Sequence, residues 1–423
     1  MRWIVLCAAC VAAAAPQHPD ANFDEAKVPV YTVPDPLVTA SGEKVRDAKT
    51  WTNKRRLEIL ELYRTEMFGR SPAKPARLNY EVASVDKQAL GGKAVRKQIT
   101  IYFAGKTDGP RMDVLLYLPA DAKKPVPVFV AVGFSGNQTV AADPGVKLGD
   151  EWVMNREAKT YAKRKATEES RGRSAQQWQV DQILAHGYGL ATVYCGDIEP
   201  DFTGGLPYGI RPLFYKAGQT GPAADDWGAI GAWAWGLSRI VDYLEKDRDV
   251  DARRIAVFGH SRMGKTAIWA GAQDTRFSLV ISNESGEGGA AIARRDYGER
   301  TKDLNRSFPY WFCGNFKKWD DREDAMPFDS HMLLALMAPR PLYVASAEGD
   351  QWSDPKGEFL GAVNASPVYE LFGKHGISAD PMPGLRQPVG DTVRYHIRDG
   401  KHDVTSYDWE QYLKFAHAQW GTR

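Results

Sequence analysis

Short apolar segments alternate with helix-favouring segments along the chain after residue 126. The clearest apolar segments cover residues 126–132, 189–194, 255–258, 277–282 and 341–346, and a more mixed one covers residues 393–397. Helices are expected at residues 173–186, 225–246, 266–272 and 407–420, and two earlier strands at residues 94–103 and 112–118. Strands that are apolar on both sides are typical of a parallel sheet with helices on both faces. The alternation therefore predicts an α/β fold, a three-layer αβα sandwich with a mostly parallel central sheet.

The chain before residue 91 has a different character. Residues 27–50 are proline-rich and are expected to run extended over the domain surface. Residues 51–68 predict an amphipathic packing helix, with apolar side chains at helical spacing at Leu57, Leu60, Tyr63 and Met67. We therefore expect an N-terminal extended segment and helix (16–90) packed on a main domain (91–423). Within that domain, residues 143–177 are polar and indicate a solvated insertion.

The first fifteen residues predict a signal peptide. They contain one positive charge, a brief apolar stretch and a run of small residues, with cleavage expected near Ala14 or Ala15. The stretch is too short to span a membrane, so we expect a secreted or periplasmic protein. Lipid modification of Cys10 is an alternative, although Cys7 stands where such a signal would carry leucine.

Composition narrows the classes of function. Lys and Arg total 55 against 53 Asp and Glu, so the net charge of +2 argues against a nucleic-acid-binding surface. After signal removal only Cys195 and Cys313 remain, which leaves open whether they pair and excludes a disulfide scaffold or a zinc cluster. The 13 tryptophans will mostly be core residues, but such a supply also suits a cleft that stacks on sugars.

The segment Gly259-His-Ser-Arg-Met-Gly264 lies between the apolar strand at 255–258 and the helix that follows. Glycines on both sides of a serine permit the strained turn that lifts a nucleophilic hydroxyl above a sheet. The usual spacing is Gly-x-Ser-x-Gly, whereas here the second glycine comes one residue later, so the motif alone is also compatible with a chance match. Arg262 can offer its backbone N–H and its guanidinium to a developing oxyanion. A surface arginine would be the alternative, but positive charge is unfavourable at a helix N-terminus.

Three polar side chains follow three of the predicted strands. Glu284 comes after the strand at 277–282, Asp350 after the strand at 341–346, and His402 after the last strand. Because parallel strands present their carboxyl ends at one edge of the sheet, all three should meet Ser261 there.

The order serine, acid, histidine is typical of an α/β-hydrolase triad, so the fold class predicted here is the α/β-hydrolase fold. His402 would take the proton from Ser261 and return it to the leaving alcohol. Either Glu284 or Asp350 could orient His402, and both could contribute. The loop 133–138 could supply part of an oxyanion hole or be an ordinary tight turn.

With these residues assembled, the chain resembles the glucuronoyl esterases of carbohydrate esterase family 15, in particular the bacterial members. The matching segments are 259–265, 283–290, 304–316 and 349–355, with His402 after Asp-Gly-Lys, and upstream 171–173, Trp178, 196–201 and 227–230. The similarity covers nearly the whole mature chain. The family's Ser-Arg-x-Gly-Lys turn also accounts for the displaced glycine.

The resemblance implies hydrolysis of the ester that joins 4-O-methyl-glucuronic acid branches of glucuronoxylan to lignin alcohols, through an acyl-enzyme and with neither metal nor cofactor. It assigns Ser261 as nucleophile, His402 as base, Glu284 as the usual acid, Asp350 as the second acid of bacterial members, Lys265 and Glu299 as contacts to sugar hydroxyls, and Trp352 as a ring packed on the sugar. We expect a monomer with no nucleic-acid partner and no membrane contact after signal removal. The loops 143–177 and 200–222 vary among members, so the preferred alcohol stays open.

Two other functions compete with this interpretation. An acetyl or feruloyl esterase could use the same fold and triad, but Lys265 near the nucleophile is unexpected in an acetyl esterase, which has no uronate sugar to hold. A non-catalytic carbohydrate-binding relative would need a broken triad, and the sequence shows none.

Overall fold

The structure is a computed structural model that describes residues 20–76, 78–105, 107, 109–155, 158, 160–378 and 381–421. The predicted signal peptide at residues 1–15, with Cys10, therefore lies outside the described residues. None of the helices in the described ranges combines the length and the apolar character that a membrane span requires.

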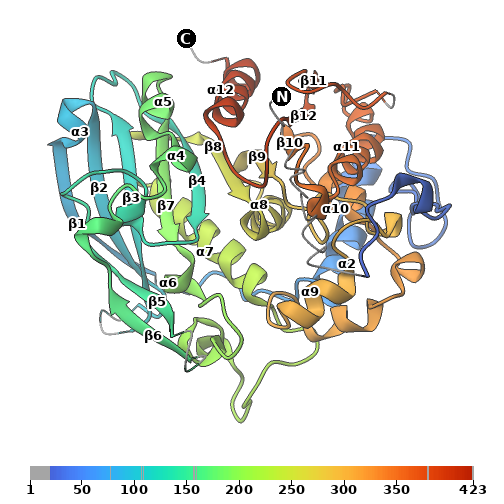
Figure 1. Ribbon diagram of the computed structural model, residues 1–423, viewed down its shortest axis with the longest axis horizontal. Coiled ribbons are helices and arrows are strands. Elements are labelled where there is room, and N and C mark those ends of the chain that lie inside the picture. Colours follow the sequence, from blue (N-terminus) through green and yellow to red (C-terminus); the bar gives the residue numbers. More distant parts are fainter. Residues whose placement is uncertain are drawn as a thin grey trace, which may run out of the picture.

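A ten-stranded sheet forms the middle layer of the described part of the chain (Figure 1). Its strands, in spatial order, are β1 (Asn79–Gln88), β2 (Ala94–Tyr102), β3 (Arg111–Pro119), β7 (Gly189–Tyr194), β4 (Val126–Gly133), β8 (Val250–His260), β9 (Phe277–Asn283), β10 (Leu342–Ala347), β12 (Val393–Arg398) and β11 (Val389–Gly390). The six strands from β7 to β12 are parallel, while β1, β2, β3 and β11 pair antiparallel at the two edges. This arrangement confirms the predicted mostly parallel sheet.

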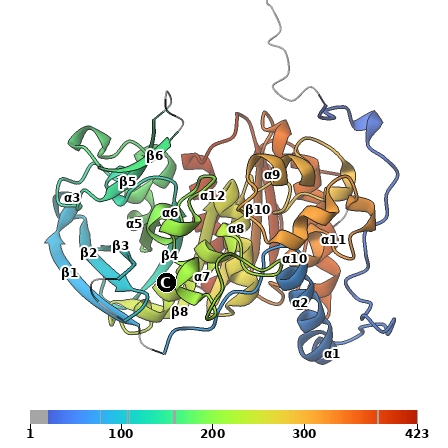
Figure 2. The ribbon, with the colours of Figure 1, turned by 90° about the horizontal axis from the view of Figure 1, so that it is seen from below.

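Helices cover both faces of the sheet (Figure 2). They are α1 (Ala48–Thr50), α2 (Arg56–Glu66), α3 (Ala89–Gly92), α4 (Ala175–Trp178), α5 (Val180–Ala185), α6 (Cys195–Ile198), α7 (Ala229–Leu244), α8 (Arg262–Gln273), α9 (Thr301–Ser307), α10 (Ser330–Ala335), α11 (Pro355–Glu370) and α12 (Ser406–Trp420). A π-helical turn at Trp51–Arg55 joins α1 to α2. Short 3-10 helices occupy Glu25–Lys27, Asn137–Thr139, Glu168–Ser170, Leu206–Tyr208, Arg211–Phe214, Ala293–Arg295, Gly314–Trp319, Glu323–Ala325 and Gln351–Ser353.

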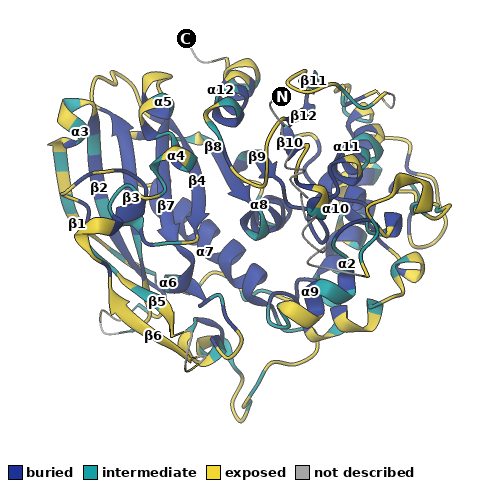
Figure 3. Cartoon of the chain, viewed as in Figure 1, coloured by how far each residue is buried: buried dark blue, intermediate teal, exposed yellow. Residues whose placement is uncertain are grey.

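The alternation of side chains along β4 divides the core into two layers. Val128 and Val130 pack with α2, α7, α8, α10 and α11 on one face, whereas Phe129 and Ala131 pack with α5 and α12 on the other. The central strands are mostly buried, α7 is buried along its whole length, and α8 is buried except at its first and last residues (Figure 3). The three-layer sandwich predicted from the apolar segments is therefore confirmed.

Some elements differ from the sequence predictions. The helix expected at 173–186 is interrupted at Gln179, which has a left-handed backbone (φ 46°), and so becomes α4 and α5. The polar insertion is largely exposed, as expected, but it contains an ordered hairpin of β5 (Asp150–Asn155) and β6 (Thr160–Lys165). In the packing helix Leu57 is exposed, while Leu60, Tyr63 and Met67 are buried as predicted.

The N-terminal part packs on the main domain. The Tyr63 hydroxyl of α2 donates a hydrogen bond to the carbonyl of Asp329 at 2.8 Å, and both groups are buried. The strand β1, which the sequence did not predict, pairs with β2 across residue 90. The division at residue 90 stays a prediction, since the two parts of the chain share one sheet.

Candidate active site

Ser261 lies on the turn between β8 and α8. Its backbone is in a region that L-residues rarely adopt (φ 57°, ψ −131°). A Cβ at Gly259 would lie 1.8 Å from the carbonyl oxygen of Met263, and one at Gly264 would lie 2.9 Å from the Cβ of Ser285. Neither position therefore has room for a side chain, and the turn has the geometry of a nucleophile elbow.

The strand ends bring the predicted side chains to one place. Glu284 follows β9, Asp350 follows β10 and its short loop, and His402 follows β12. All eight predicted site residues line one cavity of about 530 Å³: Ser261, Arg262, Lys265, Glu284, Glu299, Asp350, Trp352 and His402. The parallel strands place Ser261, Glu284, Asp350 and His402 at one edge of the sheet, as the topology predicts.

Two carboxylates face the Nδ1 atom of His402. The Oδ2 atom of Asp350 lies 2.6 Å away and the Oε2 atom of Glu284 lies 3.2 Å away. Burial alone would lower the pKa of His402, but the hydrogen bonds and charges of the two carboxylates outweigh it and raise the pKa to about 9. This arrangement stabilises the protonated imidazole ring.

The two acids differ in their surroundings. Burial raises the pKa of Asp350, but its contacts with His402 outweigh burial and leave the pKa below its ordinary value. Glu284 is buried more deeply, and burial raises its pKa to about 7 despite the nearby His402 and Arg398. Asp350 is therefore both the closer carboxylate and the one that is more readily ionised.

His260, directly before the serine, packs against the His402 ring. The ring centroids lie 4.4 Å apart, and the Nδ1 atom of His260 lies 2.7 Å from the Oδ1 atom of Asn283. Burial lowers the pKa of His260 to about 3, so the ring is neutral and does not repel a protonated His402. Sequence reasoning missed this residue, although its place in the elbow motif could have pointed to it.

The guanidinium of Arg262 is fixed beside the serine. Its Nε atom donates to Asp201 at 2.5 Å, and its Cζ atom lies 4.8 Å from the ring centroid of Phe134 and 5.3 Å from that of Trp311. Asp201 also accepts hydrogen bonds from the Tyr310 hydroxyl and the Trp311 indole, each at 2.9 Å. Arg262 is thus held at the cavity wall, and Asp201 is a second residue that sequence reasoning left unassigned.

The loop 133–138 contributes to the site indirectly. Among the described residues that line the serine's cavity, none comes from this loop. Phe134 and Ser135 instead line a neighbouring cavity of about 120 Å³ with His260. The Phe134 ring of this loop supports the Arg262 guanidinium, and the two interpretations left open by the sequence stay predictions.

Lys265 and Glu299 form a loosely paired set of charges at the cavity. The Lys265 ammonium donates to the carbonyl of Ser285 at 2.6 Å and lies 3.8 Å from the Glu299 carboxylate. Burial lowers the pKa of Lys265 and raises that of Glu299, because their side chains are only 5% and 12% exposed. Buried charges that border a cavity without a tight partner are suited to binding polar ligand groups.

Aromatic side chains complete the cavity wall. The Trp352 side chain donates a hydrogen bond to Glu299, and its ring centroid lies 6.3 Å from that of Phe23. Phe23 belongs to the N-terminal segment, which is fixed here by a hydrogen bond from the Gly298 amide to the Asn22 carbonyl at 2.8 Å. No pattern in the sequence predicts Phe23 as a site residue.

The groups near His402 also resemble a set of metal ligands. Within the described ranges, ligand atoms of Glu284, Asp350 and His402 all lie within 4.8 Å of one another. The same atoms are the ones that a histidine base and its orienting acids require, so the geometry by itself allows both functions. Cys195 and Cys313 are both free and buried, which answers the question of pairing that the sequence left open.

Comparisons with known proteins find close relatives. A sequence model described as "Glucuronyl esterase, fungi" matches residues 214–373. The curated carbohydrate esterase MZ0003, from an unknown prokaryotic organism, is 50% identical over 396 residues, which cover 93% of this chain and 91% of that protein. A 4-O-methyl-glucuronoyl methylesterase of Phanerochaete chrysosporium is 37% identical over 177 residues, 40% of this chain and 36% of that protein.

The structure of a glucuronoyl esterase from Solibacter usitatus is 68% identical to this chain. The match covers 94% of this chain and 100% of that chain, with a TM-score of 0.90. Together with the sheet order described above, this similarity confirms the predicted α/β-hydrolase fold.

Proposed function

Because this chain belongs to the glucuronoyl esterases of carbohydrate esterase family 15, we propose that it hydrolyses esters between 4-O-methyl-glucuronic acid side chains of glucuronoxylan and lignin alcohols. It is a carboxylic ester hydrolase. The observation that carries the proposal is the shared cavity of Ser261, His402 and the buried pair Lys265 and Glu299. That cavity combines an acyl-transfer site with groups that can hold a sugar acid.

The first half of the proposed reaction forms an acyl-enzyme. Asp350 accepts the Nδ1 proton of His402 in a hydrogen bond, which leaves Nε2 free to take the proton of the Ser261 hydroxyl. The Ser261 oxygen then bonds to the ester carbon, and the carbonyl oxygen becomes an oxyanion. When the bond to the alcohol breaks, His402 returns the proton to the leaving oxygen.

Arg262 is the proposed oxyanion donor. Its backbone N–H follows the nucleophile directly, as in other nucleophile elbows. Its guanidinium is held at the cavity wall by Asp201, Phe134 and Trp311, so it needs little reorganisation as the negative charge develops.

The second half releases the acid. Water attacks the acyl carbon while His402 takes one of its protons, and the bond to the Ser261 oxygen breaks as His402 returns a proton to it. The products are the alcohol and the free glucuronic acid. The family resemblance implies that these two reaction steps need neither a metal nor a cofactor, and we propose the same for this chain.

Lys265, Glu299 and Trp352 are the proposed contacts to the uronate sugar. Lys265 and Glu299 supply a donor and an acceptor for hydroxyl groups, and the pair is desolvated before the sugar arrives. The hydrogen bond from Trp352 to Glu299 fixes the indole at the cavity, where its face can pack on a sugar ring. A site for a simple acetyl group would have no use for these charges.

We further propose that the protein is exported from the cell. Residues 1–15 predict export to the periplasm or the medium, where plant polymers are accessible. We also propose that the protein acts as a monomer.

The proposed function is tested by comparing benzyl glucuronate with 4-nitrophenyl acetate as substrates for the wild type, with Ser261→Ala as the control for background hydrolysis. We expect efficient cleavage of the glucuronate ester, lost in Ser261→Ala. Efficient cleavage of the acetate without activity on the glucuronate would contradict the proposal and favour the acetyl or feruloyl esterase alternative.

A further inference from the structure

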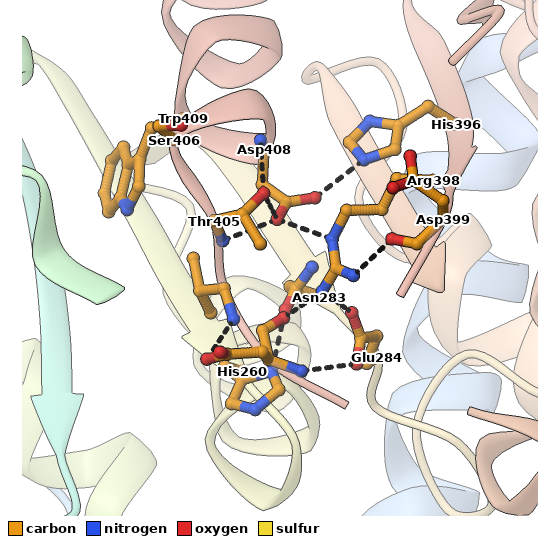
Figure 4. A network of polar contacts seen from close by, with 12 residues as sticks. His260, Asn283, Glu284, His396, Arg398, Asp399, Thr405, Ser406, Asp408 and Trp409 are labelled. Atoms are coloured by element: carbon orange, nitrogen blue, oxygen red, sulfur yellow. Dashed lines mark hydrogen bonds and ion pairs between the residues drawn. The ribbon is translucent and has the colours of Figure 1, made fainter. Parts of the chain in front are cut away.

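A buried arginine lies behind the catalytic loop. Arg398 is the last residue of β12 and is only 2% exposed. Its guanidinium lies between two carboxylates (Figure 4): Nη2 donates to Glu284 at 2.6 Å, and Nε donates to Asp408 of α12 at 2.8 Å. The Nε2 atom of His396 lies 2.9 Å from the other oxygen of Asp408, so Asp408 is itself fixed in place.

The same guanidinium holds the backbone on both sides of His402. Its Nη1 atom donates to the carbonyls of Asp399 and Lys401 at 3.0 and 3.1 Å. Its Nη2 atom donates to the carbonyl of Asp403 at 2.6 Å. The guanidinium has five N–H groups, and these contacts together with the two carboxylates use all of them.

The loop depends on these contacts for its shape. Lys401, His402 and Asp403 are exposed and belong to no helix or strand. The Gly349 amide donates to the carbonyl of Gly400 at 2.8 Å. The backbone next to His402 is held by Arg398 and by Glu284. Glu284 accepts a hydrogen bond from the Asp403 amide at 3.0 Å.

Glu284 accepts two other hydrogen bonds in addition to its contact with His402. One of its oxygens accepts from Arg398, and the other accepts from the Asp403 amide and lies 3.2 Å from Nδ1 of His402. Asp350, by contrast, directs its Oδ2 atom at the same Nδ1 from 2.6 Å. The two acids therefore have different geometric tasks.

We propose that Arg398 is a positioning residue of the esterase reaction, which clamps the loop on both sides of His402 and holds Glu284 as part of that clamp. Asp350 is then the carboxylate that orients the imidazole ring directly, and Glu284 acts on His402 mainly through the backbone. The inference rests on the proposed function, because it concerns the pair Ser261 and His402.

The test is Arg398→Lys, which keeps a positive charge but loses the planar five-donor fork. We expect kcat to fall on the order of 10²-fold, because a displacement of about 1 Å in a catalytic group has that effect. KM should change little, since Lys265, Glu299 and Trp352 come from other segments. A kcat equal to that of the wild type in a folded variant would overturn the inference.

Arg294→Lys is the matched control. Arg294 is also buried, pairs with Asp329 at 2.9 Å and donates to the carbonyls of Asp324, Met326 and Phe328, but it does not line the serine's cavity. We expect it to lower the melting temperature with kcat nearly unchanged. If the two substitutions lower the melting temperature by the same amount and kcat by the same factor, Arg398 has only a structural role.

A second measurement uses pairs of substitutions. If Glu284 works through Arg398, the effects of Glu284→Gln and Arg398→Lys on kcat should not multiply in the double variant, whereas those of Asp350→Asn and Arg398→Lys should. Multiplying effects for Glu284 and Arg398 would contradict the clamp. If Arg398 variants do not fold, Glu284→Gln and Asp350→Asn alone decide: the inference requires the Nδ1 proton resonance of His402 to shift more in Asp350→Asn.

Substrate choice separates this inference from the proposed function. Each variant is assayed with benzyl glucuronate, with 4-nitrophenyl acetate and by its rate of inactivation with a serine-directed organophosphonate, which needs only Ser261 and its base. A wild type that cleaves only the acetate overturns the proposed substrate, while the effects of Arg398→Lys on acetate cleavage and on inactivation still decide the clamp. A wild type that resists the organophosphonate and cleaves neither ester overturns both.

Discussion

Removing the charge of Asp350 should shift the pH dependence of the esterase to lower pH. In Asp350→Asn the amide can still lie near Nδ1 of His402 at a similar distance, but the negative charge that now lies 2.6 Å away is gone. His402 must be neutral to accept the serine proton, so the acid limb of kcat/KM follows the pKa of His402 in the free enzyme. Since Asp350 contributes to the raised pKa of His402, its neutralisation lowers that pKa.

The magnitude follows from the contact. A hydrogen bond to a charged group contributes about 1.5–3 kcal/mol, and one pKa unit corresponds to about 1.4 kcal/mol. The His402 side chain is 39% exposed and Glu284 remains 3.2 Å away, so solvent screening and the second acid place the effect at the lower end. We expect the acid limb to move down by about one pH unit, and the plateau of kcat to fall about tenfold because the imidazolium of the transition state loses the same stabilisation.

The assay is kcat/KM for benzyl glucuronate measured between pH 4 and pH 10, with Glu284→Gln as the matched control. The control should move the acid limb less than Asp350→Asn does, because Glu284 lies farther from Nδ1 and is engaged by Arg398 and the Asp403 amide. If Glu284→Gln moved the limb further and Asp350→Asn left it in place, the assignment of the two acids would be wrong.

Three further predictions follow from the site. Lys265→Met should raise KM for the glucuronate ester about tenfold, the effect of losing roughly 1.4 kcal/mol of binding, and leave 4-nitrophenyl acetate cleavage nearly unchanged; equal losses on both substrates in steady-state kinetics would contradict a sugar contact. The protonation of His402 should stabilise the folded state fully below its unfolded pKa of about 6.5, and this stabilisation should be lost as pH rises through the folded pKa of about 9. The melting temperature of the wild type relative to His402→Gln should therefore decline over that range, and a constant difference would contradict the raised pKa. Incubation with EDTA followed by gel filtration should leave kcat unchanged, whereas a loss restored by a divalent cation would show that Glu284, Asp350 and His402 hold a metal.

The sequence predicted the strands that position the catalytic residues. Each strand is followed within a few residues by its polar residue, and these residues come in the order serine, acid, histidine. The apolar strands ending before Glu284 and Asp350, and the last strand before His402, fixed these residues to one edge of the sheet. The displaced glycine could be understood only through the family resemblance. The structure adds its cause: Gly264 packs closely against Ser285, so a larger residue would not fit.

Features that depend on contacts between distant segments could not be predicted. Arg398 ends a strand and looks like any polar residue at a sheet edge until the loop folds back over it. Phe23 reaches the cavity from the N-terminal segment, before the first predicted helix, where the sequence has no periodicity. The strand β1 is mostly exposed along its length and lacks the alternation that marks a half-buried strand. These residues are positioned by tertiary packing, which leaves no local pattern in the sequence.

The clamp gives a physical reason for two acids beside one histidine. Two free carboxylates within 3.2 Å of one nitrogen would repel each other and favour protonation of one of them. Arg398 offsets the charge of Glu284 and ties it to the loop backbone, so the carboxylate left to respond to the proton on His402 is Asp350. When Asp350 is neutralised, the Glu284 carboxylate can still stabilise the proton on Nδ1 of His402. Asp350→Asn should for that reason keep measurable activity, and the double variant Asp350→Asn/Glu284→Gln should fall well below it.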